Sequence, residues 1–318
     1  MPDIIISRLE TPEVNLYYTL RGSGPILLIL QGGAGNAEGS EALADQLAGQ
    51  FTVVTYDRRG LSRSTPVRAE GHEIAIHAID AARLLAALSP APAFVFGSSM
   101  GALIGLELTA EHSALVRLLI AHEPPVYRLL EGAEQDEALR THTELLETFR
   151  RDGLPAAMKL MIARSGVDIN DREPEVPMPL VPPVDPKSAA QREADLQHFL
   201  TWDAPAVARY QPNIAALKSA RSKIVPAIGS SYLRFPIAAL ADCLASWDAS
   251  RLSSRAATPA TFSVPRHSQR SSTNCSSGKA KLHLKGQWRP RGKRSASMEA
   301  AGFELRAGQL GGADFYPR

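Results

Sequence analysis

The amino-acid sequence predicts an α/β protein: a doubly wound, mostly parallel sheet, a helical lid inserted late in the chain, and a poorly ordered C-terminal tail. Three observations favour this fold class. Short apolar segments alternate with helix-length segments over the first 125 residues. A long amphipathic helical block follows them. Beyond that block the composition becomes basic and rich in Ser and Arg.

The predicted strands and helices alternate along the first part of the chain. The expected strands are residues 13–20, 25–30 (PILLIL), 51–56 (FTVVTY), 94–96 and 117–121, and the expected helices are residues 40–49, 74–88 and about 99–112. Short continuous apolar runs such as PILLIL are typical of strands that are buried on both faces. The pattern therefore predicts a parallel sheet covered by helices on both sides.

The second part of the chain divides into three segments, which follow a core segment at residues 1–125. Residues 126–220 have amphipathic helical periodicity and are assigned to the lid. Residues 221–250 begin with a strand pattern (SKIVPAIG, 222–229) and are assigned to an incomplete return to the core. Residues 251–318 form the tail, in which Ser and Thr are frequent and apolar periodicity is weak.

Length and composition exclude several classes of protein. The chain has 318 residues, 44% of them hydrophobic, which is enough for one sizeable core with an inserted lid. It has neither an apolar run of membrane-spanning length nor a signal-peptide pattern, so we expect no membrane association and a cytoplasmic location. Cys243 and Cys275 are too few for a disulfide framework and have the wrong spacing for a zinc site.

Charge is distributed unevenly. The tail at residues 251–318 carries 13 Lys and Arg against 3 Asp and Glu, whereas residues 1–250 carry 22 against 30. A basic tail can attract a polyanion. This one contains no recognisable nucleic-acid-binding module, so nucleic acid is not the expected partner.

Residues 94–105 (FVFGSSMGALIG) place Ser99 between a strand and a helix, with Gly97 and Gly101 two positions to either side. A sharp turn flanked by small residues exposes the hydroxyl at its centre. The start of a helix offers free backbone N–H groups and a dipole that favours negative charge. Ser99 is therefore the predicted nucleophile, and the N–H of Met100 is the predicted first donor to the oxyanion that forms on attack.

The loop after an earlier strand supplies the second predicted oxyanion donor. Residues 31–35 read QGGAG, and we expect the amide of Gly33, ahead of that of Ala34, to point into the site. The alternative is that both segments are ordinary glycine turns between strands and helices. The strand–turn–helix context of Ser99 favours the catalytic interpretation.

These motifs resemble those of the α/β-hydrolase superfamily, in its esterase and cofactor-free haloperoxidase-like branch, over residues 1–229. The matching segments are QGGAG, DRRGLSRS (57–64), GSSMG (97–101) and the helical block before SKIVPAIG. The family usually has His where Gln31 stands and Gly where Ser62 stands. The resemblance implies hydrolysis of an ester, thioester, amide or related acyl bond, with no metal and no organic cofactor.

The loop that begins with Asp57, Arg58 and Arg59 has two interpretations. These charged side chains could bind a carboxylate or phosphate of the substrate. Alternatively, they hold neighbouring loops together through hydrogen bonds, which is what the resemblance implies. We favour the second interpretation because structural ion pairs also gather near active sites.

The catalytic acid and base are harder to place. In this fold they follow the serine in the order acid, then histidine, but no carboxylate follows SKIVPAIG before Asp242. Glu123, in the HEPP segment after the preceding strand, is the candidate acid; the alternative is a loop carboxylate that pairs locally. His267 and His283 are the histidines downstream of the lid, and their polar, basic surroundings are typical of solvated chain rather than of a held base.

A change of reading frame near residues 229–235 would account for these departures. Residues 252–263 (LSSRAATPATFS) can be encoded by synonymous codons that read Glu-Phe-Pro-Gly-Gly-His-Ala-Gly-Tyr-Val-Leu in a shifted frame. That peptide resembles the last strand and histidine loop of the family. If the frame has shifted, the chain lacks the last strand, the last helix and the catalytic histidine.

The predicted function is therefore hydrolysis of an acyl bond in a small-molecule substrate, with Ser99, Met100, Gly33 and Glu123 at the site, and with activity lost if no histidine is supplied. The alternative is a non-catalytic protein whose remaining pocket binds a small acyl compound or whose tail binds a polyanion. The lid sets the identity of the substrate, and lid sequences carry no portable code for it. The sequence leaves the oligomeric state open.

Overall fold

A computed structural model describes residues 3–66, 73–165, 186–227, 240 and 243–244. The predicted tail at 251–318, with His267 and His283, lies outside the described residues. So do Asp242 and the segment in which the frame change is expected.

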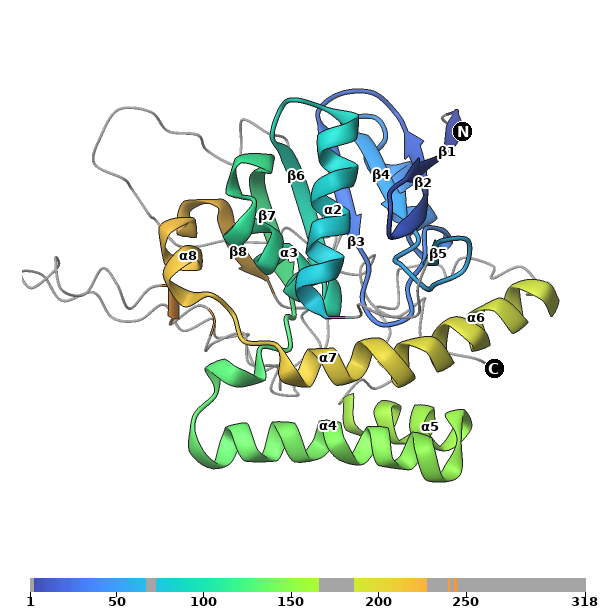
Figure 1. The fold of residues 1–318 in the computed structure, drawn as a ribbon, viewed down its shortest axis with the longest axis vertical. Helices are drawn as coiled ribbons and strands as arrows, with labels where there is room; N and C mark the ends of the chain where they lie inside the picture. The colour runs from blue at the N-terminus through green and yellow to red at the C-terminus, as the bar shows by residue number, and fades with distance from the viewer. Residues whose placement is uncertain (1–2, 67–72, 166–185, 228–239, 241–242, 245–318) are drawn as a thin grey trace, which may run out of the picture.

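The strands form one mixed, mostly parallel sheet (Figure 1). They are β1 (Ile4–Glu10), β2 (Val14–Arg21), β3 (Ile26–Leu30), β4 (Thr52–Tyr56), β5 (Thr65–Pro66), β6 (Ala93–Ser98), β7 (Val116–His122) and β8 (Ile224–Ala227). The strand order is β1-β2-β4-β3-β6-β7-β8, with the short β5 paired to β2. Strands β4, β3, β6, β7 and β8 are parallel, and β1 and β2 add antiparallel pairs at one edge. The predicted fold class is confirmed.

Strand β1 was not expected from the sequence. Its three isoleucines, Ile4, Ile5 and Ile6, are consecutive and exposed, so the segment has neither the alternation of a half-buried strand nor the burial of a central one. It forms by pairing along its full length with β2, from Ile4 opposite Arg21 to Glu10 opposite Asn15.

Helices cover both faces of the sheet, and others lie beyond one end of it. They are α1 (Glu41–Leu47), α2 (Ile74–Leu88), α3 (Met100–Glu111), α4 (Gly132–Asp152), α5 (Leu154–Ser165), α6 (Pro186–His198), α7 (Ala204–Arg209) and α8 (Ile214–Ser219), with a π-helical turn, η4 (Phe199–Asp203), between α6 and α7.

Strand β3 shows why the sheet is buried on both sides. Its successive side chains point to opposite faces. Leu28 and Leu30 pack into the core under α2 and α3, whereas Leu27 and Ile29 pack into the second core under α1. The continuous apolar run that predicted this strand therefore reflects two separate layers of packing.

Helices α4 to α7 lie across the end of the sheet where the parallel strands finish (Figure 1). This placement brings α6 and η4 against the loops that follow β3 and β4, through contacts described below. In the part of the chain that the structure describes, no helix is long and apolar enough to cross a membrane. Nor do three or more His, Cys, Asp or Glu residues gather there in a group that could hold a metal ion.

Candidate active site

Ser99 occupies the single-residue turn between β6 and α3. Its backbone has φ 51° and ψ −121°, a conformation that L residues adopt rarely and that is often found at functional sites. Its N–H donates to the carbonyl of His122 on the neighbouring strand, at 2.8 Å. Ser99 is the residue that precedes the first turn of α3, yet its side chain makes no capping hydrogen bond. The hydroxyl is therefore not used to stabilise the helix.

The two flanking glycines are required by close backbone contacts. A Cβ on Gly97 would lie 2.5 Å from the carbonyl oxygen of Gly101. A Cβ on Gly101 would lie 1.9 Å from the carbonyl oxygen of Leu30, at the end of β3. Because both obstacles are backbone atoms, neither position accepts a side chain without moving a strand or a helix. The small residues that the sequence places around Ser99 thus have a demonstrable steric reason.

The QGGAG loop lies against Ser99. A Cβ on Gly32 would lie 3.0 Å from the Cβ of Ser99 and 3.0 Å from the carbonyl oxygen of Ser98. The next residue, Gly33, has a positive φ of 42°, which glycine adopts at little cost. The structure therefore brings together three of the four predicted site residues: Ser99, the adjoining Met100 at the start of α3, and the loop that carries Gly33.

Glu123, the fourth predicted site residue, follows β7 at the same end of the sheet as Ser99. Ser98 and His122 are paired in the parallel register of β6 and β7, so Glu123 comes one residue after the partner of Ser98. It also has a positive φ, of 51°, and its N–H donates to the carbonyl of Ala227 in β8 at 2.9 Å. The carboxylate is largely buried, and its Oε1 lies 3.8 Å from Nε2 of His122.

His122 is a residue at this site that sequence reasoning missed. Its Nδ1 lies 3.4 Å from the hydroxyl of Ser98, and burial lowers its pKa to about 4. The imidazole is therefore neutral at pH 7. The sequence does contain a signal: His122 ends the strand beside the one that carries Ser99, directly before the candidate acid Glu123.

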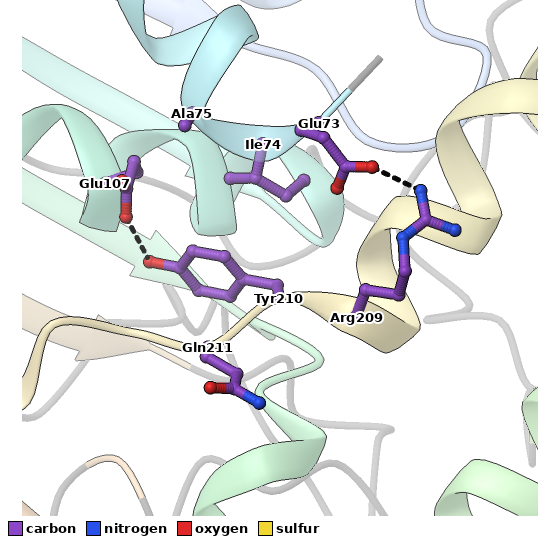
Figure 2. A pocket seen from close by; sticks show the side chains of 7 residues that line it. All are labelled: Glu73, Ile74, Ala75, Glu107, Arg209, Tyr210 and Gln211. Carbon is purple, nitrogen blue, oxygen red and sulfur yellow. Dashed lines mark hydrogen bonds and ion pairs between the residues drawn. The ribbon is translucent and has the colours of Figure 1, made fainter. Parts of the chain in front are cut away.

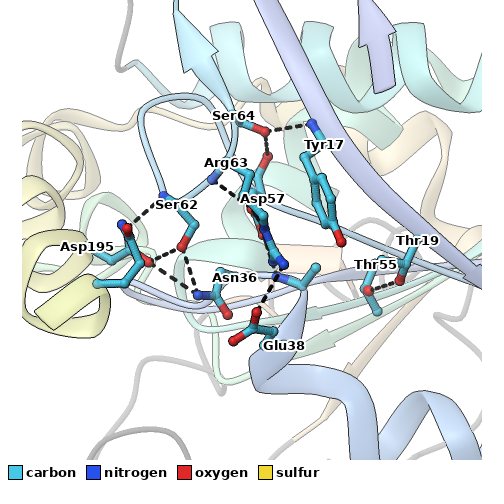
Figure 3. Close-up of polar contacts among 12 residues, drawn as sticks. Tyr17, Thr19, Asn36, Glu38, Thr55, Asp57, Ser62, Arg63, Ser64 and Asp195 are labelled. Carbon is cyan, nitrogen blue, oxygen red and sulfur yellow. Dashed lines mark hydrogen bonds and ion pairs between the residues drawn. The ribbon is translucent and has the colours of Figure 1, made fainter. Parts of the chain in front are cut away.

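Asp57 and Arg59 hold neighbouring segments together through hydrogen bonds, as the second interpretation expects. Asp57 accepts hydrogen bonds from the N–H of Ala37 and from the backbone and guanidinium of Arg63 (Figure 3). Arg59 makes two hydrogen bonds of 2.8 Å to Asp80 in α2. These contacts join the loop after β4 to the loop after β3 and to α2.

Gln31 and Ser62, the two departures from the family pattern, each make hydrogen bonds to nearby loops or helices. Ser62 has a positive φ of 44°, and both its N–H and its hydroxyl donate to the carboxylate of Asp195 in α6 (Figure 3). The same carboxylate accepts from Asn36. The amide of Gln31 donates to the carbonyl of Asn36 at 3.0 Å. Both substituted side chains therefore organise the loops next to the site.

A shallow cavity of about 170 Å³ lies elsewhere, between the start of α2, helix α3 and the end of α7 (Figure 2). It is lined by Glu73, Ile74, Ala75, Glu107, Arg209, Tyr210 and Gln211. The hydroxyl of Tyr210 donates to Glu107, and burial raises the pKa of both groups. None of the predicted site residues lines this cavity.

Comparisons with known proteins show which family the chain resembles. Residues 25–172 match the family model described as the alpha/beta hydrolase fold. The chain is 36% identical over 228 residues to the uncharacterized hydrolase YraK of Bacillus subtilis, covering 70% of this chain and 78% of YraK. It is 30% identical over 134 residues to the 2-(acetamidomethylene)succinate hydrolase of Mesorhizobium japonicum, covering 42% of this chain and 48% of that protein.

Solved structures share the fold at lower identity. A carboxylesterase structure from the thaumarchaeon Nitrososphaera gargenis superimposes with a TM-score of 0.54 at 18% identity, covering 74% of this chain and 86% of that one. The sheet that carries Ser99, the glycine loop and Glu123 is therefore shared with that solved structure. By this sheet, its family match and its similarity to YraK, the chain belongs to the α/β-hydrolase superfamily.

Proposed function

We propose that the protein is a serine hydrolase that cleaves an ester or related acyl bond of a small molecule, with Ser99 as the nucleophile. The observation that carries this proposal is the strained turn at Ser99. Two glycines that cannot be replaced without moving backbone hold the residue at φ 51°, and its hydroxyl makes no helix cap. Strain of this kind persists where function requires it.

Each predicted site residue has a separate role in the reaction. The Oγ of Ser99 attacks the carbonyl carbon, and the backbone N–H groups of Met100 and Gly33 donate to the oxyanion that develops. The carboxylate of Glu123 holds a protonated base in place. The hydroxyl proton passes to that base and then to the leaving alcohol, after which water hydrolyses the acyl-enzyme. No step requires a cofactor.

The base is the open part of this scheme. His267 and His283 lie outside the described residues. Restoring the frame over residues 252–263 would instead supply the histidine of the Gly-Gly-His-Ala-Gly segment. Among the described residues, no side chain makes a hydrogen bond to the hydroxyl of Ser99. The second candidate function is a non-catalytic protein that keeps the hydrolase pocket and binds a small acyl compound without turning it over.

Turnover of p-nitrophenyl acetate distinguishes the two functions. The purified protein is compared with Ser99→Ala and with a variant whose frame is restored from about residue 229. Activity in the original protein that disappears in Ser99→Ala supports the serine hydrolase with a working base. Activity only in the restored variant supports a hydrolase scaffold that has lost its base. Activity that survives Ser99→Ala would contradict the assignment of the nucleophile.

A further inference from the structure

The guanidinium of Arg58 is fully buried, directly behind the glycine loop. Its Nη1 donates to the carbonyl of Gln31 at 3.0 Å, and its Nη2 donates to the carbonyl of Gly33. These carbonyls belong to the loop to which the proposed function assigns the second oxyanion donor. Arg58 therefore fixes the backbone of that loop through two of its carbonyl groups.

The same guanidinium also reaches the lid. Its Nη2 lies 3.1 Å from Oδ2 of Asp203, and both side chains have no exposed surface. Asp203 is the last residue of the π-helical turn η4 between α6 and α7. Its other carboxylate oxygen lies 3.3 Å from Nε2 of His77 in α2. Single π-helical turns inside α-helices are rare and occur frequently at functional sites.

The planar, charged side chain of Arg58 connects the position of Asp203 to the position of the glycine loop. A guanidinium is planar, so the directions of its N–H groups are fixed relative to one another. A buried cation also requires a compensating anion, because leaving it unpaired is strongly destabilising. Asp203 and the two loop carbonyls therefore hold the same rigid group, and displacement of Asp203 displaces or frees the loop.

We propose that Arg58 is a positioning residue that couples the lid, through Asp203, to the loop carrying Gly33. The inference rests on the proposed function, since it gives that loop an oxyanion donor. When η4 is docked, Arg58 holds the N–H of Gly33 in place for catalysis. When η4 moves away, the loop loses one of the partners that orient it.

The adjacent residue provides a matched control. Arg59 is also buried and makes two hydrogen bonds of 2.8 Å to Asp80, but these contacts join the loop to α2 rather than to the lid. Lysine at either position keeps the charge and loses the planar fork. Arg58→Lys and Arg59→Lys therefore perturb neighbouring buried ion pairs in the same way, and only the first disturbs the proposed link.

The experiment measures amide hydrogen exchange in the full-length protein together with kcat and KM for p-nitrophenyl acetate. For Arg58→Lys we expect exchange about tenfold faster in residues 31–35 and 199–203. We also expect kcat to fall by up to about 100-fold with little change in KM, since a small displacement of a catalytic group has an effect of this size. Arg59→Lys should leave both exchange segments and the ratio of kcat to KM close to the original protein.

Two further outcomes keep the inference separate from the proposed function. If no form of the protein turns over the ester, the proposed function fails, whereas exchange still tests the link. If exchange in residues 31–35 is the same in Arg58→Lys and Arg59→Lys, the link is contradicted even in an active enzyme. Should Arg58→Lys not fold, Arg58→Met/Asp203→Leu removes both charges at once, and faster exchange in residues 31–35 of this folded variant is then the expected result.

Discussion

The ends of two neighbouring strands, β6 and β7, both place a non-glycine residue at positive φ, but they do so in different ways. At the end of β6, Ser99 is held by glycines whose absent side chains let β3 and α3 approach. At the end of β7, Glu123 is held by a hydrogen bond to β8 and lies next to the buried His122. The backbone conformation of Ser99 is indicated by the residues next to it in the sequence, whereas that of Glu123 depends on a strand about 100 residues later.

This difference indicates which site residue keeps its conformation when the chain changes after β8. The turn at Ser99 is built from β3, β6, α3 and the carbonyl of His122 at the end of β7, and none of these lies beyond residue 122. The position of Glu123 depends on Ala227, the last residue of β8. A change in the chain after β8 therefore threatens the acid and the base before it threatens the nucleophile.

Glu123→Gln tests the end of β7 as the source of the acid. In whichever form of the protein turns over the ester, we expect kcat to fall by roughly 10⁴-fold, as for the acid of other serine hydrolases. The matched control is Glu111→Gln, in α3 and exposed, which should leave kcat unchanged. The measurement is steady-state kinetics on both variants. Equal kcat values in the two variants would show that Glu123 is not the catalytic acid.

Gly101→Ala tests the steric requirement at the end of β6. The new Cβ would meet backbone of Leu30 at 1.9 Å, so we expect a loss of stability at or above the upper end of the roughly 1–3 kcal/mol typical of overpacking. Gly105→Ala, one turn later in α3, is the control. Its Cβ would meet Cδ1 of Leu119 at 2.6 Å, and that side chain can rotate away. Urea denaturation should therefore separate the two variants, and similar midpoints would show that the turn at Ser99 is not sterically locked.

His122→Gln tests the electrostatics at the end of β7. The pKa of His122 is about 4 in the folded protein and near 6.5 in the unfolded chain, so the unfolded state binds more protons between these values. The contribution of His122 to the free energy of unfolding is therefore fully present above pH 6.5 and is lost as the pH decreases towards 4. Between pH 7 and pH 5 this group accounts for a loss of about 2 kcal/mol.

The measurement is urea denaturation at pH 7 and pH 5 for both proteins. The variant should lose about 2 kcal/mol less than the original over this interval. His142, whose pKa burial also lowers, is present in both proteins and cancels in the difference. If the two pH dependences are parallel, the imidazole of His122 is either solvated or held protonated by Glu123.

Ser98→Ala distinguishes the two adjacent serines and is expected to have the smallest effect. The hydroxyl of Ser98 lies 3.4 Å from His122, which is long for a hydrogen bond. We expect a loss of less than about 1 kcal/mol in stability and ester turnover within a few-fold of the original. A loss of turnover as large as that of Ser99→Ala would instead make Ser98 the nucleophile.

The sequence predicted most of the sheet and the turn at Ser99, because the residue patterns that indicate them lie within each segment. Helix α2 was expected at residues 74–88 and lies at Ile74–Leu88, since its apolar residues recur with helical spacing. The glycines around Ser99 marked the turn for the steric reasons given above. The contact between Arg58 and Asp203 could not be predicted, because it joins residues 145 positions apart and depends on how the lid docks. The role of Ser62 was hidden for the same reason.

Covalent labelling with a fluorophosphonate, followed by peptide mass spectrometry, tests whether Ser99 is the nucleophile. The reagent modifies a serine that an oxyanion hole and a base activate. The experiment uses the original protein and the frame-restored variant, each beside its Ser99→Ala counterpart. We expect a single label on the peptide that contains residues 98 and 99, located at Ser99 and absent from Ser99→Ala. A label on another serine, or no label in a folded, frame-restored protein, would contradict the assignment of Ser99 as the nucleophile.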